Sequence, residues 1–348
     1  MKLPLPTVKG RGAQIQLPNR FTNEQIYQEV NPPGGEKTKY LSVHPKTIIN
    51  KVDSRDIPYN YSLNPYQGCE HGCVYCYARP THNFWGYNAG LDFEQVILVK
   101  ANATQLLEQK LSSKSWQPNV IMLSGNTDCY QPIEHHLKVT RGLLETFWRF
   151  RHPVGIITKN ALIERDLDVL RLLAQNGLVR VVFSVTGADE QIRKHLEPRT
   201  STYKERFKAI KTLKEAGIPV MVLMAPVIPS INDHEVFEVA RLASDHGADD
   251  IRFIVVRLND EVQDVFMHWL DTLYSDKKNR VMNQIKDLHG GQVEDKRYGV
   301  RMKGEGELAE VLHQQFKLAR TKYFPNPPNF EYNLKLHPLY KTSQLSLF

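Results

Sequence analysis

Short apolar runs alternate with amphipathic segments from residue 95 to about residue 276. The runs are rich in β-branched side chains and cover residues 120–123, 154–157, 179–185, 220–224 and 251–256. An unbroken apolar run of a few residues is typical of a strand buried on both faces of a parallel sheet. The pattern therefore predicts five buried parallel strands, and we expect a sixth short strand within residues 61–66.

The segments between the runs predict helices. Apolar side chains recur at helical spacing in residues 163–174 and 207–217. Gly177, Gly217 and Gly247 follow such segments and predict helix ends. Strand and helix units of about 30 residues predict a parallel sheet with right-handed crossovers. About six units are too few for an eightfold barrel, so the pattern leaves a doubly wound sheet and an incomplete barrel both open.

The regions that flank the core, residues 61–276, lack this alternation. Prolines and glycines interrupt residues 1–60, which we expect to form an irregular N-terminal extension with residues 9–12 as a solvated basic arm. Residues 277–324 predict a helical, basic C-terminal extension. Residues 325–348 begin as a Pro-rich linker and end in a tail.

The composition is ordinary for a globular protein. The chain has 348 residues, of which 41% are apolar, and it contains no run of about 18 apolar residues that could span a membrane. The N-terminus lacks the apolar core of a signal peptide. Three of the four cysteines lie close together, which does not suit a disulfide framework and indicates a reducing compartment. We therefore expect a cytoplasmic protein with no membrane partner.

Charge is concentrated at the two ends of the chain. Residues 277–348 carry 13 Lys/Arg and 7 Asp/Glu, a balance of +6, and residues 1–45 carry 6 and 3, a balance of +3. The whole chain is +7, so the middle is about −2. Basic ends around a near-neutral core favour a polyanionic partner such as nucleic acid, although exposed helices and tails are often basic without one.

Three cysteines with short spacers are the strongest chemical signal in the sequence. Cys69, Cys73 and Cys76 cannot all pair as disulfides, but they can all face one metal centre. A 4Fe–4S cluster held by three cysteines would leave one iron for a small molecule. The alternative is zinc, with His71 or His82 as fourth ligand. Because structural zinc sites usually draw on two separated ligand pairs, and a second pair is missing, the spacing favours the cluster.

The cysteine spacing, with Tyr75 before the third cysteine, resembles the signature of radical S-adenosylmethionine (SAM) enzymes. The resemblance covers roughly residues 60–275 and implies an incomplete (β/α)6 TIM-like barrel. It also implies a 4Fe–4S cluster whose open iron binds SAM, reductive cleavage of SAM to a 5′-deoxyadenosyl radical, and an electron donor such as flavodoxin or ferredoxin. The stretches 64–80, 126–134, 196–199 and 302–306 are similar to the branch that neighbours spore photoproduct lyase, whose members are labelled DNA repair photolyase-like.

Polar residues follow nearly every predicted strand, where a barrel of this kind has its active site. From the chemistry of SAM we expect its amino group near Asn126, Thr127 and Asp128, its carboxylate near a cation, its ribose near a hydroxyl, and its adenine beside an aromatic ring. Lys159 or Arg199 would supply the cation for the carboxylate, Ser184 the hydroxyl for the ribose, and Tyr75 the aromatic ring for the adenine. Glu197, in the same loop as Arg199, is a further candidate for SAM binding. The alternative for Glu197 and Arg199 is a structural ion pair between them, and for Asp128 a helix N-cap ahead of residues 134–149.

Cys129 is the remaining cysteine. A thiol close to a substrate radical could return a hydrogen atom, and spore photoproduct lyase uses a cysteine in this general region. The register is shifted here, so that Gly125 would take the position of that cysteine. We therefore name Cys129 as a catalytic candidate, and its alternative is an inert small core residue.

The last five residues match the pentapeptide by which many bacterial replication and repair proteins bind the β sliding clamp. Gln344, Leu345, Leu347 and Phe348 would supply the contacts, because a short extended peptide with apolar anchors suits a preformed groove. The alternative is a hook that packs on its own domain.

Three hypotheses follow from the sequence. The first is a radical SAM enzyme that acts on DNA, in lesion repair or modification, and is recruited by the β sliding clamp. The second keeps the radical chemistry but gives it RNA, a protein or a small metabolite as substrate. The third is a non-catalytic, metal-stapled module that binds nucleic acid.

Overall fold

The structure is a computed structural model, and it describes residues 8–17 and 38–338 of the chain. Its main sheet has the strand order β10-β9-β8-β7-β6-β3-β2. Strands β3 to β10 in this order run parallel to their neighbours, and β2 runs antiparallel at one edge. The strands are β2 (Ile49–Lys51), β3 (Tyr61–Leu63), β6 (Ile121–Leu123), β7 (Val154–Thr158), β8 (Val179–Ser184), β9 (Val220–Val227) and β10 (Asp250–Val255).

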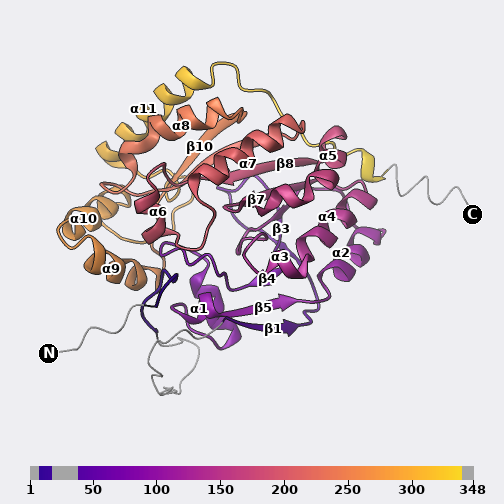
Figure 1. Ribbon diagram of the computed structural model, residues 1–348, viewed down its shortest axis with the longest axis horizontal. Coiled ribbons are helices and arrows are strands. Elements are labelled where there is room, and N and C mark those ends of the chain that lie inside the picture. Colours follow the sequence, from indigo (N-terminus) through magenta and orange to yellow (C-terminus); the bar gives the residue numbers. More distant parts are fainter. Residues whose placement is uncertain (1–7, 18–37, 339–348) are drawn as a thin grey trace, which may run out of the picture.

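Six parallel strands confirm the six predicted units, and the mixed α/β fold is consistent with an incomplete (β/α)6 TIM-like barrel. Figure 1 shows the helices that connect the strands along the outer side of the sheet. They are α2 (Ala103–Ser112), α3 (Glu134–Leu137), α4 (Val139–Arg149), η2 (Ala161–Asp166), α5 (Leu167–Gln175), α6 (Glu190–Leu196), α7 (Tyr203–Glu215), η3 (Asp233–Glu235) and α8 (Val236–Asp245). Helix α9 (Val262–Leu273) follows the last strand, β10.

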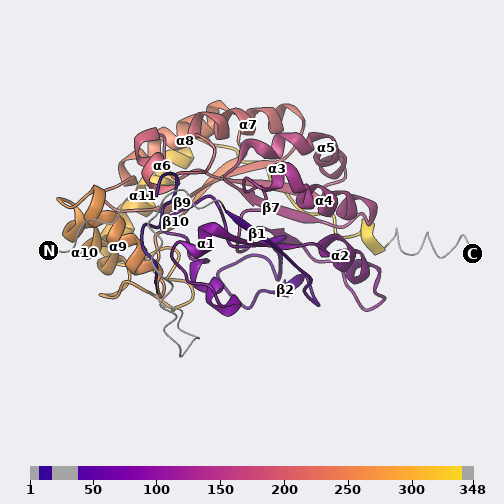
Figure 2. The same ribbon diagram turned by 60° about the horizontal axis from the view of Figure 1, so that its bottom comes forward.

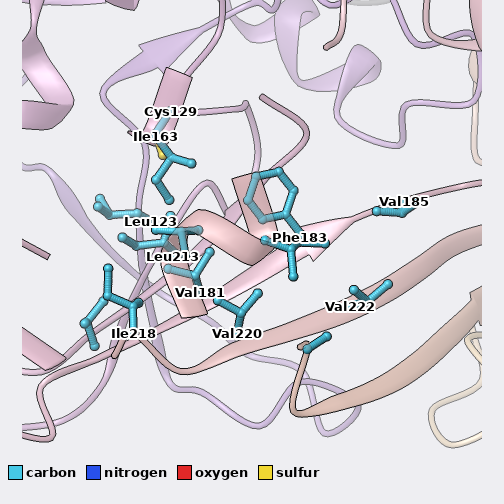
Figure 3. Close-up of a cluster of buried hydrophobic side chains, with 14 of the residues drawn as sticks. Leu123, Cys129, Ile163, Val181, Phe183, Val185, Leu213, Ile218, Val220 and Val222 are labelled. Carbon is cyan, nitrogen blue, oxygen red and sulfur yellow. The ribbon is translucent and has the colours of Figure 1, made fainter. Parts of the chain in front are cut away.

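The predicted helix ends are confirmed at three glycines. Gly177, Gly217 and Gly247 have φ values of 66°, 76° and 83°. A residue with a Cβ is strained in this left-handed region, so glycine there ends the helix and turns the chain into the next strand. The core lies between helices and sheet. Figure 3 shows part of it, with Cys129 beside Ile163.

A second, small sheet has the order β1-β5-β4. It consists of β1 (Lys39–Val43), β5 (Val96–Lys100) and β4 (Tyr66–Gln67), and near it lie η1 (Arg79–Trp85) and α1 (Asp92–Gln95). In Figures 1 and 2 this sheet and α1 lie on the side of the molecule away from α7 and α8. The prediction that residues 1–60 are irregular is therefore wrong for β1 and β2. β1 pairs with β5, more than 50 residues further along the chain, and β2 pairs with the nearby strand β3.

The C-terminal extension is only partly helical. Helices α10 (Lys278–Leu288) and α11 (Gly306–Tyr323) form, but residues 289–305 between them contain no helix. Residue 302 accepts a backbone hydrogen bond from Val255, so this connection lies beside the end of β10. After α11 the chain passes the amino-terminal ends of the strands, where Asn333 N donates a hydrogen bond to Gly177 O ahead of β8 (2.9 Å). Among the described residues, none of the helices has the length and apolar character to cross a membrane.

Candidate cluster site

A tight loop of residues 68–76, called the cluster loop below, joins β4 to η1 and carries three of the cysteines. Gly68 and Gly72 have φ values of 80° and 67°. A Cβ on Gly68 would lie 2.6 Å from Val96 O, so only glycine fits there. Cys69 N donates to Phe93 O (2.8 Å), which ties the loop to α1. The loop thus has a defined shape, with Cys69 and Cys73 buried, Cys76 half-buried, and all three thiols free.

The N-terminal segment, residues 8–17, lies directly on this loop. Gly12 N and Ala13 N donate to the carboxylate of Glu94 (3.0 and 2.7 Å). A Cβ on Gly12 would sit 1.7 Å from Gly72 O, so the two backbones touch. The prediction of a solvated arm at residues 9–12 therefore holds for Lys9 and Gly10, which are exposed, and is wrong for Gly12, which is buried. The lack of apolar residues there does not imply exposure, because the segment packs through its backbone.

A fully buried ion pair between Arg79 and Glu94 stabilises the cluster loop. Arg79 donates to Cys73 O through Nε and Nη2 (3.1 and 2.8 Å), and it also reaches Ala89 O and Gly90 O. Its charge is balanced by Glu94, and neither side chain is exposed to solvent. Glu94 therefore joins three segments: the N-terminal segment, the cluster loop and α1.

A second buried network lies beside Cys73, around Glu197. The carboxylate of Glu197 accepts from the hydroxyls of Tyr75 and Thr186 and pairs with Arg206. Burial raises the pKa of Glu197, but the charges of Arg206 and Lys159 and these hydrogen bonds outweigh burial and lower it to about 2. Arg206, on α7, also donates to Ser184 O (3.0 Å), so one arginine links the end of β8 to the cluster loop.

Lys159 follows β7 and points toward the same place. Its Nζ lies 5.9 Å from the centre of the Tyr75 ring. Burial lowers the pKa of Lys159, but the negative charges of Cys73, Glu197 and Asp128 outweigh it, so the pKa is raised. The ammonium group is therefore charged and half-buried at the edge where the cysteines lie.

The residues after β6 hold the loop in place. Asn126 Nδ2 donates to Gln67 and Thr81 (3.2 and 3.1 Å), and Thr127 Oγ1 donates to Tyr66 O (2.9 Å). Asp128 accepts from Thr158 Oγ1 and Lys159 N, both 2.8 Å, and so bridges the ends of β6 and β7. These three predicted SAM contacts already make hydrogen bonds within the protein.

The remaining predicted residues are spread around the loop. Ser184 Oγ is buried and donates to Ala225 O (3.3 Å). Arg199 pairs with Glu70 (3.0 Å), not with Glu197, so the expected Glu197–Arg199 ion pair is wrong: each residue has a different partner. Arg199 N donates to His71 O (3.2 Å), which fixes this side of the loop.

Cys129 lies in the main hydrophobic core and is fully buried. Burial raises the pKa of its thiol well above the ordinary value. Its backbone N–H donates to Ser124 Oγ (2.7 Å), and its carbonyl accepts from Thr140 (2.6 Å). This placement favours the alternative of an inert small core residue.

The donor set fits an iron–sulfur cluster. The thiols of Cys69, Cys73 and Cys76 are close enough for their charges to affect one another. Burial raises the pKa of Cys69 to about 12 and that of Cys73 well above its ordinary value, so thiolates at these two residues require a cationic partner. Within residues 8–17 and 38–338, no three His, Cys, Asp or Glu side chains are arranged to hold a single ion.

The two histidines proposed as zinc ligands are otherwise placed. His71 Nδ1 lies 3.4 Å from Asp128, and burial lowers its pKa to about 4, so its ring is neutral at pH 7. The His82 ring packs edge-on against Phe93, 5.6 Å between centroids. Sequence reasoning did not find the Arg79–Glu94 pair or Arg206, because a buried arginine and an exposed one look alike in sequence.

Replacing Glu197 with glutamine is expected to change the acid dependence of stability. The folded-state pKa of about 2 lies below the ordinary 4.5, so this carboxylate stabilises the fold above about pH 4.5, and the contribution is lost as the pH falls toward 2. Glu197→Gln should lower the free energy of unfolding at neutral pH and flatten its fall in acid. Urea unfolding of the iron-free chain at several pH values measures this. The exposed Glu145→Gln is the control, and equal slopes for wild type and Glu197→Gln would contradict the prediction.

Comparisons with known proteins agree with this site. The radical SAM superfamily matches residues 63–243. An uncharacterized protein of Mycobacterium tuberculosis is 30% identical over 248 residues, which cover 70% of this chain and 73% of that protein. The sporulation killing factor maturation protein SkfB of Bacillus subtilis is 28% identical over 237 residues, 68% of this chain and 52% of SkfB.

A solved structure has a similar fold. It is a variant of spore photoproduct lyase with bound S-adenosylmethionine and dinucleoside spore photoproduct, and it superposes with a TM-score of 0.60. The superposition covers 84% of this chain and 82% of that one at 19% identity. At this identity the likeness shows the fold and no more.

Proposed function

The chain belongs to the radical SAM superfamily, and from this premise we propose that it applies radical chemistry to DNA, in repair or modification of a base. Enzymes of this superfamily carry a 4Fe–4S cluster and use SAM. Membership therefore removes the hypothesis of a non-catalytic, metal-stapled module. The choice of DNA as substrate is the part that experiment has to decide.

In this proposal Cys69, Cys73 and Cys76 hold the cluster, which supplies the electron that cleaves SAM. Arg79 fixes the backbone of Cys73, and Glu94 fixes Arg79. Lys159 offers a charged ammonium to the SAM carboxylate, and the Tyr75 ring, oriented by Glu197, lies beside it. The electron comes from a small redox protein such as flavodoxin or ferredoxin.

The other predicted SAM residues remain proposals with a second task. Asn126, Thr127 and Asp128 join the cluster loop to the ends of β6 and β7, and an acceptor oxygen has lone pairs for a further partner. Ser184 ends β8 beside them. Arg199 pairs with Glu70 on the side of the loop that the N-terminal segment covers. We therefore assign Arg199 to stabilising the loop and not to binding SAM.

The observation that carries the choice of DNA is a pair of exposed tyrosines, one directly after the cluster loop and one on the C-terminal connection with a cation against its ring. Tyr77 directly follows Cys76 and is 50% exposed. Tyr298 is also 50% exposed, and the Arg301 guanidinium lies 4.4 Å from the centre of its ring. Aromatic rings with nearby cations are surfaces on which nucleic-acid bases stack. The fold shared with spore photoproduct lyase and the basic chain ends are further support.

The peptide alternative rests on one relative, SkfB, whose name refers to maturation of a sporulation killing factor. This chain spans only about half of SkfB. A peptide substrate would not need the basic ends of the chain. We therefore keep it as the second candidate.

The proposed clamp-binding residues, Gln344, Leu345, Leu347 and Phe348, lie outside the described residues. The last described segment, up to residue 338, lies at the amino-terminal ends of the strands, where His337 Nδ1 lies 2.7 Å from Phe150 O ahead of β7. The cysteines lie at the carboxyl-terminal ends.

The proposal predicts that DNA stimulates SAM cleavage. The reduced, cluster-loaded enzyme is incubated with ultraviolet-irradiated DNA, unirradiated DNA, or a peptide mixture, and 5′-deoxyadenosine is quantified by chromatography. We expect several-fold more product with DNA than without it. Stimulation by peptides but not by DNA would replace the proposal with the second candidate.

Recruitment by the β clamp is tested separately by pull-down. Binding to the clamp should be lost when Leu345, Leu347 and Phe348 are replaced by alanine and kept in the control variant Ser346→Ala.

A further inference from the structure

Arg257 is a half-buried arginine at the carboxyl-terminal ends of the strands, where the cluster loop also lies. It follows β10 by two residues, as Lys159 follows β7 by one. The carboxyl ends of parallel strands meet at one edge of a sheet, so Arg257 lies at the same edge as the cluster loop. None of the roles above uses it.

The guanidinium of Arg257 makes no hydrogen bond or ion pair with any part of the chain that the structure describes. Comparable arginines are fully engaged: Arg79 and Arg206 each bond several oxygens. The neighbouring Arg301 pairs with Asp56 and donates to Ser54. Burial and the charge of Arg301 lower the pKa of Arg257, which means that its surroundings do not favour the cation. The guanidinium is half-buried in surroundings that disfavour its charge, so an anion from outside the chain would stabilise it.

Arg257 is tied closely to the cluster loop. Asn259 Nδ2 donates to Tyr77 O (3.3 Å), and Tyr77 directly follows Cys76. The Tyr77 hydroxyl in turn donates to Gly125 O after β6. Arg257 and Tyr77 are near enough for each to affect the pKa of the other. An anion held by Arg257 would therefore lie near Tyr77, at the end of the cluster loop that carries Cys76.

We propose that Arg257 binds a phosphodiester group of the nucleic-acid substrate, beside the nucleotide presented to the cluster. This inference rests on the proposed function and gives that site its backbone contact. The SAM carboxylate is the other candidate anion, but Lys159 serves it from β7, and β9 and β8 separate β7 from β10. A planar guanidinium can take two phosphate oxygens at once, and Tyr77 and Tyr298 offer rings to adjacent bases.

The test measures how binding depends on salt. Fluorescence anisotropy of labelled single-stranded DNA and RNA of the same sequence is recorded at several NaCl concentrations with the cluster-loaded full chain. We expect Arg257→Gln to weaken binding about tenfold for every sequence and to lower the slope of log K against log salt by about one. Arg257→Lys should recover part of the affinity, because the charge is kept but two-point contact is lost.

Arg252→Gln is the matched control. Arg252 lies on the same strand but is exposed and paired with Asp250 (3.0 Å), so its loss should leave affinity and slope unchanged. The cluster absorbance of each variant reports whether the loop has formed. DNA with neutral methylphosphonate linkages should bind wild type and Arg257→Gln equally, because the contact is to phosphate charge.

The outcomes separate the inference from the proposed function. If DNA binds but Arg257→Gln binds it as wild type does, with the cluster intact, the inference is overturned and the proposed function stands. If only RNA binds, and Arg257→Gln weakens it, DNA as substrate fails and the phosphodiester contact is supported. If neither nucleic acid binds the wild type, both are overturned.

Discussion

Replacing Cys73 with alanine is expected to abolish SAM cleavage. The thiol is buried and flanked by the other two cysteines, and Arg79 holds the carbonyl of the same residue. Changes to groups that only support metal ligands already cost about 10–100-fold, so loss of a ligand should cost more than about a hundredfold. The variant, purified and reconstituted without oxygen, should lack the visible absorbance of the cluster and form no 5′-deoxyadenosine above background.

Cys129→Ala is the control for this prediction. It makes the same chemical change at a fully buried cysteine in the hydrophobic core. We expect it to keep the cluster absorbance, with a loss of roughly 1 kcal/mol in the free energy of unfolding. Full cluster content and SAM cleavage in Cys73→Ala would mean that the metal site is elsewhere. Loss of substrate turnover in Cys129→Ala with SAM cleavage intact would restore the prediction that Cys129 returns a hydrogen atom.

Replacing Glu94 with alanine is expected to lower stability by about 3–5 kcal/mol, since it leaves the buried charge of Arg79 without its partner. Neither side chain of the Arg79–Glu94 pair is exposed, so water cannot replace the carboxylate without rearrangement. The same change frees Gly12 N and Ala13 N, which both donate to Glu94. We therefore expect the N-terminal segment to become sensitive to protease and the cluster to bleach faster in air.

Thermal or urea unfolding, limited proteolysis and the rate of absorbance loss measure these effects. Glu238→Ala is the matched control. Glu238 pairs with Arg241 on the exposed face of α8, where solvent screens the two charges, so the pair contributes little to stability. A Glu94→Ala variant as stable as Glu238→Ala would show that the buried pair can be removed without cost. Unchanged proteolysis would show that the N-terminal segment is held by other contacts.

Local patterns predicted most of the regular core. The five apolar runs became β6, β7, β8, β9 and β10 with ends shifted by a few residues, because strands buried on both faces need continuous apolar side chains. The strands β1, β2 and β5 were not predicted. β1 and β2 are short and mostly exposed, so they carry little apolar signal. β1 forms through backbone pairing with β5, which is far away in the sequence, and β2 through pairing with the neighbouring β3.

The cysteine spacing by itself determined the kind of chemistry, since three thiols in eight residues restrict the metal and the family. The glycines determined where helices end, because only glycine readily adopts a positive φ. Tertiary structure alone decided how charged residues are used. It paired Glu197 with Arg206 and Arg199 with Glu70, buried Arg79 against Glu94, and placed the N-terminal segment on the cluster loop. It also left Arg257 without an ion-pair partner among the residues that the structure describes. Charge partners are set by distances across the fold, and these distances leave no local trace in a sequence.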